Sequence, residues 1–421
     1  MLDFRRDMDK RALFVTSCVS LVTTSMSFAI RGDVANDIAA AFHITNEQFG
    51  LVLSPAFWAF AVAIVAGGAI VDWIGMRALH VLSAVGYFVG VVLIVLAPRP
   101  DATVVSLFDH AGTLMLYAGF LVMGLSQGLV EAIINPLVVT IYSGEKIKKL
   151  AALHAWWPGG QIIGGLIAVF MTTTLQASWQ WKLTTILVPA GIYLAMAMMN
   201  RYPQTERVAS NVTGGEMWRE ALRPLFILFF FCNAMTSAAE LGPSQWFPKV
   251  MGDLIPQMQG VLFLVYTAGL MFVLRTFFSD FAQKAPLGTL IVCSVLTFTG
   301  LYWLGSLQPG GSAFVAFLAA TLFGVGTTYF VPTMLGMASE QLPRGGALLM
   351  SLMGGAGMLS VAFALPLMGA RIDQAGGGAA LQFMSWLGAV LAVVFVGLWL
   401  YFRSRGGYRV VRLSTDGAPD L

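Results

Sequence analysis

Apolar windows of about 20 residues, each long enough to cross the hydrocarbon core of a bilayer as a helix, recur along this chain, and we count about twelve of them. Their centres lie near Val22, Phe60, Tyr87, Gly124, Ile167, Ile192, Phe230, Thr267, Leu296, Phe323, Leu359 and Val393. Of the 421 residues, 57% are hydrophobic and 11% are charged, whereas soluble domains contain about 45–50% apolar and about 25% charged residues. The sequence therefore predicts an all-α integral membrane protein in a lipid bilayer.

The connections between the windows differ in basic residues. One side of the predicted membrane holds Arg5, Arg6, Lys10, Arg11, Arg77, Lys146, Lys148, Lys149, Arg201, Arg207, Arg219, Arg223, Lys284, Arg344, Arg403, Arg405, Arg409 and Arg412. The other side holds only Arg99, Lys182, Lys249 and Arg371. By the positive-inside rule, we expect the first side and both termini to be cytoplasmic. We expect a multi-pass protein of the cell membrane, of the bacterial inner membrane type.

The polar segment 201–219 divides the windows into two sets of six. We expect an N-terminal bundle at 1–200, a cytoplasmic linker at 201–221, a C-terminal bundle at 222–402 and a cytoplasmic tail at 403–421. The halves resemble each other, since the fourth window reads Gly128, Glu131, Pro136 and the tenth reads Gly324, Thr327, Pro332 with the same spacing from Gly to Pro. Six plus six spans with a repeat favour a transporter that holds its substrate near the midplane.

Several function classes are disfavoured. The formal net charge of +3 argues against a nucleic-acid partner. The three cysteines fall inside apolar windows and are interpreted as buried thiols. Because no zinc-type Cys/His cluster and no nucleophile–base pair occurs, we expect no metal, no cofactor and no enzymatic activity. We expect the protein to be a monomer.

Between the second and third windows the chain reads Gly68-Ala69-Ile70-Val71-Asp72-Trp73-Ile74-Gly75-Met76-Arg77. This segment resembles the G-x-x-x-D-x-x-G-x-R signature of the major facilitator superfamily, and it lies where that family carries it. Gly68 suits a close helix contact and Gly75 a tight turn. We predict that Gly68, Asp72, Gly75 and Arg77 form a conformational latch whose charged contacts break when the halves move.

Glu131 is a carboxylate inside a long apolar window, where an ionised acid costs about 2.5–3.5 kcal/mol on insertion scales. Such a residue usually faces a polar cavity, and exchange of a proton there is what a proton-coupled carrier needs. The alternative is a structural hydrogen bond to a neighbouring helix.

Three stretches resemble the fucose:proton symporter family of sugar transporters more closely. They are Ala41 to Gly50, the E-x-x-x-N-P run from Glu131 to Pro136, and Leu153-His154 with Gly160 beyond. Pro332-Thr333 and Arg275 also have counterparts. The resemblance implies that Asp33 and Glu131 serve proton coupling. The chain departs from the family at Arg31 and Gly32, at Ala151 and at Trp157, which bears on the identity of the sugar.

Arg31 and Asp33 lie near the outer end of the first span, about 30 Å from Arg11 at 1.5 Å per residue. In one interpretation, they form an interfacial ion pair that only anchors the helix. In the other, Asp33 faces the cavity, and Arg31 tunes the pKa of Asp33 or holds substrate. Glu240 is expected to close the seventh span before a break at Gly242-Pro243, either as a site residue or as an exposed helix-end acid. The candidate substrate-binding residues are Arg31, Asn135, Trp157, Gln161, Glu240, Gln245 and Tyr329.

The resulting hypothesis is a secondary active transporter for a monosaccharide or similar small polar solute, with symport of a cation that we expect to be the proton. One alternative keeps the fold and makes Arg31 bind a carboxylate, giving a carrier or exporter of an organic anion or sugar acid. Another is a transport-inactive sensor or scaffold with the same fold.

Overall fold

The computed structural model describes residues 9–104, 106–142, 149, 152–203, 214–278, 282, 284–342 and 346–409, and the regular structure in these ranges is helical. The helices of the N-terminal half are α1 (Lys10–Asp33), α2 (Ala35–Ala41), α3 (Asn46–Leu53), α4 (Pro55–Ile74), α5 (Met76–Val95), α6 (Ala111–Ile141), α8 (Trp156–Thr173), α9 (Trp179–Thr184) and α10 (Leu187–Met199). Those that follow are α12 (Gly214–Ala221), α13 (Pro224–Leu254), α14 (Val261–Phe277), α16 (Pro286–Gly305), α17 (Ala313–Thr327), α18 (Phe330–Gln341) and α19 (Gly346–Ser404).

Each of the predicted span centres falls inside one of these helices. Within the described ranges, nine helical stretches are long and apolar enough to cross a membrane, and α14 is a shorter apolar helix. The stretch at α19 holds two predicted spans, because Gly376 at φ 84° interrupts its helical geometry between Leu359 and Val393. The predicted all-helical membrane fold is confirmed.

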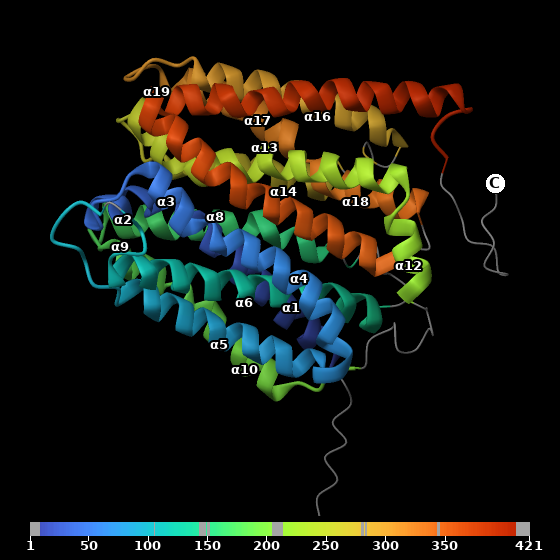
Figure 1. Ribbon diagram of the computed structural model, residues 1–421, viewed down its shortest axis with the longest axis horizontal. Helices are drawn as coiled ribbons and strands as arrows, with labels where there is room; N and C mark the ends of the chain where they lie inside the picture. Colours follow the sequence, from blue (N-terminus) through green and yellow to red (C-terminus); the bar gives the residue numbers. More distant parts are fainter. Residues whose placement is uncertain are drawn as a thin grey trace, which may run out of the picture.

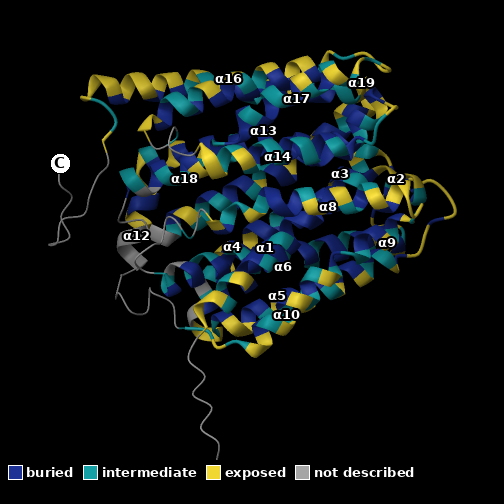
Figure 2. Ribbon diagram, turned by 180° about the vertical axis from the view of Figure 1, so that it is seen from behind, coloured by how far each residue is buried: buried dark blue, intermediate teal, exposed yellow. Residues whose placement is uncertain are grey.

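The two halves form two layers of roughly parallel helices (Figure 1). In the first half α1 packs on α8 and α4 packs on α6, and in the second α13 and α16 pack on α19. Figure 2 shows exposed residues along the outer edges, at α5 and α10 on one side and α16 on the other. Large apolar side chains are exposed there, including Leu82, Val188 and Val292. These faces are suited to contact with lipid.

Helix α13 differs from the expectation for the seventh span. It continues through Gly242 and two prolines, Pro243 and Pro248, to Leu254. Glu240 is therefore buried in the middle of a 31-residue helix and does not end it. Proline within a membrane helix is tolerated where other groups use the carbonyls it frees. Ser244, which lies between the two prolines, donates a hydrogen bond to the Glu240 carbonyl at 2.6 Å.

The segment between the halves has helical structure at its end, where α12 occupies the last eight residues of the expected linker. Residues 204–213 and the tail from 410 lie outside the described residues. The counterpart spans of the repeat also differ. Helix α6 is continuous through Pro136, whereas the tenth span is divided at Thr328-Tyr329 between α17 and α18.

The halves meet closely at the end that carries α2 and α3. Asp373 of α19 accepts hydrogen bonds from the backbone N–H groups of Asn46 at 3.3 Å and Glu47 at 2.9 Å. These are the first two N–H groups of α3, which have no partner within the helix. The side chain of Thr45 accepts from the next N–H, that of Gln48. A side chain of the second half therefore helps to cap a helix of the first.

Two further contacts close the same end. Lys249 of α13 donates to the Asn36 side chain of α2 at 2.7 Å. Backbone approach is also tight, because a Cβ added at Gly50 would lie 2.7 Å from the Cα of Pro366. The end with α2 and α3 is thus closed by contacts between the halves.

We predict that Asp373→Ala opens this end. Loss of an N-cap acceptor costs about 1 kcal/mol, which raises the population of separated ends about fivefold. The measurement is the distance distribution between spin labels at two exposed positions, Ala40 of α2 and Gln308 of the second half. The exposed Asp101→Ala is the control and is expected to leave the distribution unchanged. An unchanged distribution in Asp373→Ala would contradict the closing role.

Candidate functional site

Glu131 begins a chain of hydrogen bonds in the first half. Its carboxylate accepts from the Nδ2 of Asn135 at 3.0 Å, one helical turn along α6. The Oδ1 of Asn135 lies 2.9 Å from the Nε2 of His154, which precedes α8. Because the amide nitrogen donates to Glu131, the amide oxygen accepts from the His154 ring. All three side chains are half-buried. The chain links a carboxylate to a second titratable group on another segment.

Arg31 of α1 is fully buried. Its guanidinium carbon lies 4.5 Å from the ring centre of Phe28 and 5.2 Å from that of Phe57 on α4. Within the described part of the chain, its three guanidinium nitrogens have no hydrogen-bond partner. The Trp157 ring of α8 packs edge-on against Phe28 at 5.0 Å. Three aromatic rings therefore gather at this part of α1.

One turn earlier, α1 joins α5 and α6 through polar side chains. Thr24 is hydrogen-bonded to the Tyr87 hydroxyl at 2.9 Å. Gln127 of α6 donates to Ser27 at 2.7 Å, and its Oε1 is buried without a partner. The polar groups of α1 and α6 thus form one connected region.

The second half contributes an acid and a base. Glu240 of α13 lies 3.9 Å from the guanidinium of Arg275 on α14. The Nε of Arg275 donates to the Thr328 carbonyl at 2.8 Å, where α17 gives way to α18. The other carboxylate oxygen of Glu240 is buried and has no partner. Glu240 and Arg275 thus compensate each other's charge, and one carboxylate oxygen of Glu240 stays available as an acceptor.

Gln245 of α13 connects the halves. Its Nε2 donates to the Phe28 carbonyl of α1 at 3.0 Å, while its Oε1 is buried without a partner. Tyr329 lies elsewhere, because its hydroxyl donates to the Leu274 and Phe278 carbonyls at the end of α14. Gln161 is buried in α8. The structure therefore brings Arg31, Gln245 and Trp157 together and places Tyr329 apart from them.

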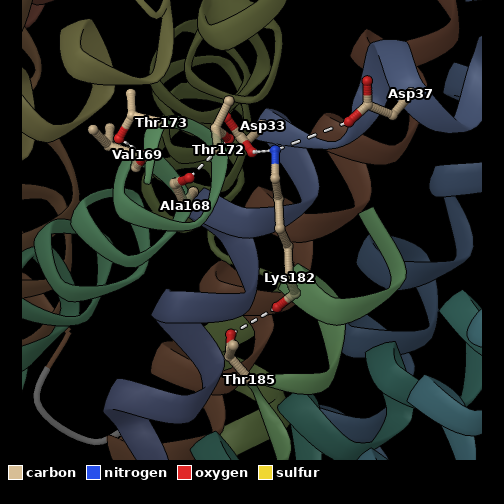
Figure 3. Close-up of polar contacts among 8 residues, drawn as sticks. All are labelled: Asp33, Asp37, Ala168, Val169, Thr172, Thr173, Lys182 and Thr185. Carbon is tan, nitrogen blue, oxygen red and sulfur yellow. Dashed lines mark hydrogen bonds and ion pairs between the residues drawn. The ribbon is translucent and has the colours of Figure 1, made fainter. Parts of the chain in front are cut away.

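Asp33, the last residue of α1, is paired with Lys182 of α9 at 2.8 Å (Figure 3). The Lys182 ammonium also lies 3.9 Å from Asp37 of α2. Burial raises the pKa of Asp37, which Lys182 opposes and Asp33 reinforces. The expected pairing of Arg31 with Asp33 is not present, since residues two apart on a helix do not face each other. Asp33 thus helps to fix the ends of α1, α2 and α9, and its role in proton coupling stays a prediction.

The latch motif lies at the junction of α4 and α5. Gly75 adopts φ 89°, a conformation that favours glycine. Arg77 donates to the Met198 carbonyl near the end of α10, within the same half. The close helix contact expected at Gly68 is not present, since a Cβ added there would meet no atom of the described residues within 4 Å. Asp72 lies in α4, but its side chain is outside the described part of the structure. The latch role stays a prediction.

Three functional candidates were not assigned from the sequence. His154 and Arg275 were noted only as part of the family resemblance. Lys182 was noted only as one of the few basic residues on the less basic side of the predicted membrane. Their partners are 19 to 149 residues away along the chain. The signal that was available is an embedded charge in or beside an apolar window, which requires some partner.

We predict that Lys182→Met lowers the free energy of unfolding by about 3–5 kcal/mol, because it leaves the carboxylate of Asp33 buried and unpaired. The side chains of Lys182 and Asp33 are only 5% and 11% exposed. The double variant Asp33→Asn/Lys182→Met should recover much of the loss. Thermal unfolding in detergent measures both, with the exposed Arg99→Met as control. Equal stabilities for the single and double variants would argue against the pair.

Comparison with known proteins shows the family to which this chain belongs. A family model described as Major Facilitator Superfamily matches residues 13–347. No curated protein matches the chain. The partially occluded inward-open structure of the xylose transporter XylE from E. coli is similar, with a TM-score of 0.75 and 13% identity over 92% of this chain and 97% of that one.

Two other solved structures are similar over most of their length. A D-xylose-proton symporter gives a TM-score of 0.73 at 12% identity, covering 91% of this chain and 96% of its own. The nucleoside transporter NupG gives 0.68 at 12% identity, covering 92% and 98%. Identities this low show the fold alone. The family match spans most of the sequence, and the chain belongs to the major facilitator superfamily of membrane transporters.

Proposed function

We propose that this chain is a secondary active transporter that moves a small polar solute by alternating access, with symport of protons. The observation that carries the coupling is the chain from Glu131 through Asn135 to His154. A carboxylate within a span is expensive to keep ionised, so binding and release of a proton there can be linked to movement of the halves. The amide of Asn135 connects the carboxylate of Glu131 to the ring of His154 through one hydrogen bond to each.

The solute site proposed here lies where α13 crosses α1. Among the buried side-chain oxygens that have no partner in the described structure are those of Gln127 and Gln245, which both contact α1, and that of Glu240, which lies near Arg275 of α14. Unpaired polar atoms of this kind are rare in folded proteins, because each costs about 1–3 kcal/mol. They come from both halves, which is where a transporter of two repeats holds its substrate. A hydroxylated solute would supply the missing donors.

The distribution of basic residues and the contacts between the halves support an assignment of the two ends of the bundle to the two sides of the membrane. In Figure 1, α12 and the end of α19 lie at one end of the bundle, with α2, α3 and α9 at the other. The basic connections support a cytoplasmic position for the end with α12, and both termini with it. The contacts of Asp373 and Lys249 then close the extracellular end. The latch at Gly75 and Arg77 would act at the cytoplasmic end.

For the substrate, a monosaccharide remains the first hypothesis. Support comes from the resemblance to fucose:proton symporters and from the two xylose transporters of similar fold. The second hypothesis is an organic anion or sugar acid, and the unpaired guanidinium of Arg31 favours it. A transport-inactive sensor would tolerate neutralisation of Glu131.

We predict that Glu131→Gln abolishes accumulation of solute against its gradient, because the amide cannot release a proton. Counterflow exchange of the same solute should persist, since exchange needs no net proton movement. Uptake into proteoliposomes with and without an imposed pH gradient measures both. Glu47→Gln, which changes the same chemistry at an exposed position on α3, should accumulate solute like the parent.

The coupling role would be wrong if Glu131→Gln concentrated solute as the parent does. A second outcome would also count against it. If a pH gradient drives no accumulation in the parent while a sodium gradient does, the coupling ion is not the proton.

A further inference from the structure

Arg31 stands apart from the other buried cations of the described structure. Lys182 is paired with Asp33 at 2.8 Å. Arg275 donates to the Thr328 carbonyl and lies near Glu240. Arg31 is 0% exposed, and none of its guanidinium nitrogens has a hydrogen-bond partner. An ion left buried and unpaired carries a large desolvation penalty. The sequence keeps a charge here that the fold itself does not use.

The surroundings of Arg31 compensate the charge only in part. Phe28 and Phe57 provide cation–π contacts at 4.5 and 5.2 Å. A ring attracts the cation but replaces none of the five N–H hydrogen bonds that a guanidinium can donate. The carboxylates of Asp33 and Glu131 bond to other groups, Lys182 and Asn135. Because no acceptor among the described residues lies within hydrogen-bond distance of the Arg31 guanidinium, a bound molecule could supply its partner.

The groups next to Arg31 narrow the chemistry of that partner. The planar guanidinium fork matches a carboxylate, which it binds through two parallel hydrogen bonds. Gln127 donates to Ser27 and Gln245 donates to the Phe28 carbonyl, so both side chains approach the same two turns of α1. Their free Oε1 atoms are acceptors and call for hydroxyl donors. The edge of Trp157 against Phe28 adds an apolar surface.

We propose that Arg31 binds the carboxylate of the transported solute, and that the substrate is a small hydroxylated carboxylic acid of the sugar-acid class. This inference rests on the proposed transport function and selects between its two substrate hypotheses. Arg31 is then a substrate-binding residue, and Gln127 and Gln245 accept hydrogen bonds from the hydroxyl groups.

The central charges agree with a monoanion. Arg31 and Arg275 carry two positive charges, and Glu131 and Glu240 carry two negative charges when ionised. Protonation of Glu131 leaves one positive charge in excess, which a bound carboxylate neutralises. One proton and one monoanion would cross together, and release of both would restore the starting state. Transport of this kind moves no net charge across the membrane.

Binding to the purified full chain in detergent tests the proposal. The probes are matched pairs, D-galacturonate with D-galactose and D-gluconate with D-glucitol, with affinity taken from ligand-dependent thermal stabilisation. At least one acid should stabilise the parent more than its neutral partner does. Arg31→Gln should weaken binding of that acid about 30-fold or more, the loss expected on removing one partner of a buried charge pair. Arg31→Lys should recover only part, because an ammonium lacks the planar fork.

Arg371→Gln is the matched control. Arg371 also lies over an aromatic ring, that of Phe383 at 5.1 Å, but it is exposed and lies in the middle of α19, shortly before the interruption at Gly376. It should bind the acids like the parent.

A second readout needs no ligand. Arg31→Met removes the unpaired charge and keeps an unbranched side chain, so the melting temperature of the ligand-free protein should rise or stay level. A purely structural arginine would give a fall of several degrees instead.

The inference is overturned if no acid stabilises the parent, if a neutral partner binds as tightly as its acid, or if Arg31→Gln keeps the parent's affinity. A fall in melting temperature of Arg31→Met also overturns it. Failure of the transport proposal has a different signature, which is that proteoliposomes exchange neither the acids nor the neutral sugars. If proteoliposomes exchange neutral sugars but not the acids, the transport proposal stands and the proposal that Arg31 binds a carboxylate is wrong.

Discussion

The rest of the structure depends on one constraint, which is that polar groups in hydrocarbon have to find partners within the protein. The backbone meets it by forming helices throughout the described residues. The many Ser and Thr side chains of α1 meet it by donating to carbonyls one turn earlier, as Thr16 does to Ala12 and Ser17 to Leu13. Lys182 and Asp33 meet it as an ion pair. Against this background, a buried polar group without a partner is a departure that calls for a functional explanation.

Three of the described residues with such departures lie around one stretch of α1. Arg31 and the free amide oxygens of Gln127 and Gln245 lie near Phe28, where the second half crosses the first. The same crossing is part of the contact between the halves, so a solute bound there would touch both of them. Binding energy and conformational change would then act through the same residues, as alternating access requires. A solute of the proposed chemistry would supply the hydrogen bonds that these groups lack.

The two halves share an architecture but contribute different charged side chains. The first half holds the Glu131 chain and the unpaired Arg31, while the second compensates its base with Glu240. Their counterpart spans also differ, since α6 is continuous and the tenth span is divided at Thr328-Tyr329. The carbonyl freed at this division is the one that Arg275 uses. Divergence of the repeats thus gives one half a carboxylate hydrogen-bonded to Asn135 and the other a carboxylate near Arg275.

The amino-acid sequence by itself determined the membrane fold, the positions of the spans and the embedded charge at Glu131, because hydrophobicity over a window of 20 residues is a local property. It also marked Arg31 and Asp33 as unusual. Only the tertiary structure decided their partners. Asp33 is bonded to Lys182, 149 residues later, and Asp373 caps α3 from 326 residues away. Helix α13 continues through Pro243 and Pro248 to Leu254, although the sequence predicted a break there. Pairing in a bilayer is settled by which helices pack together, and no local pattern records that.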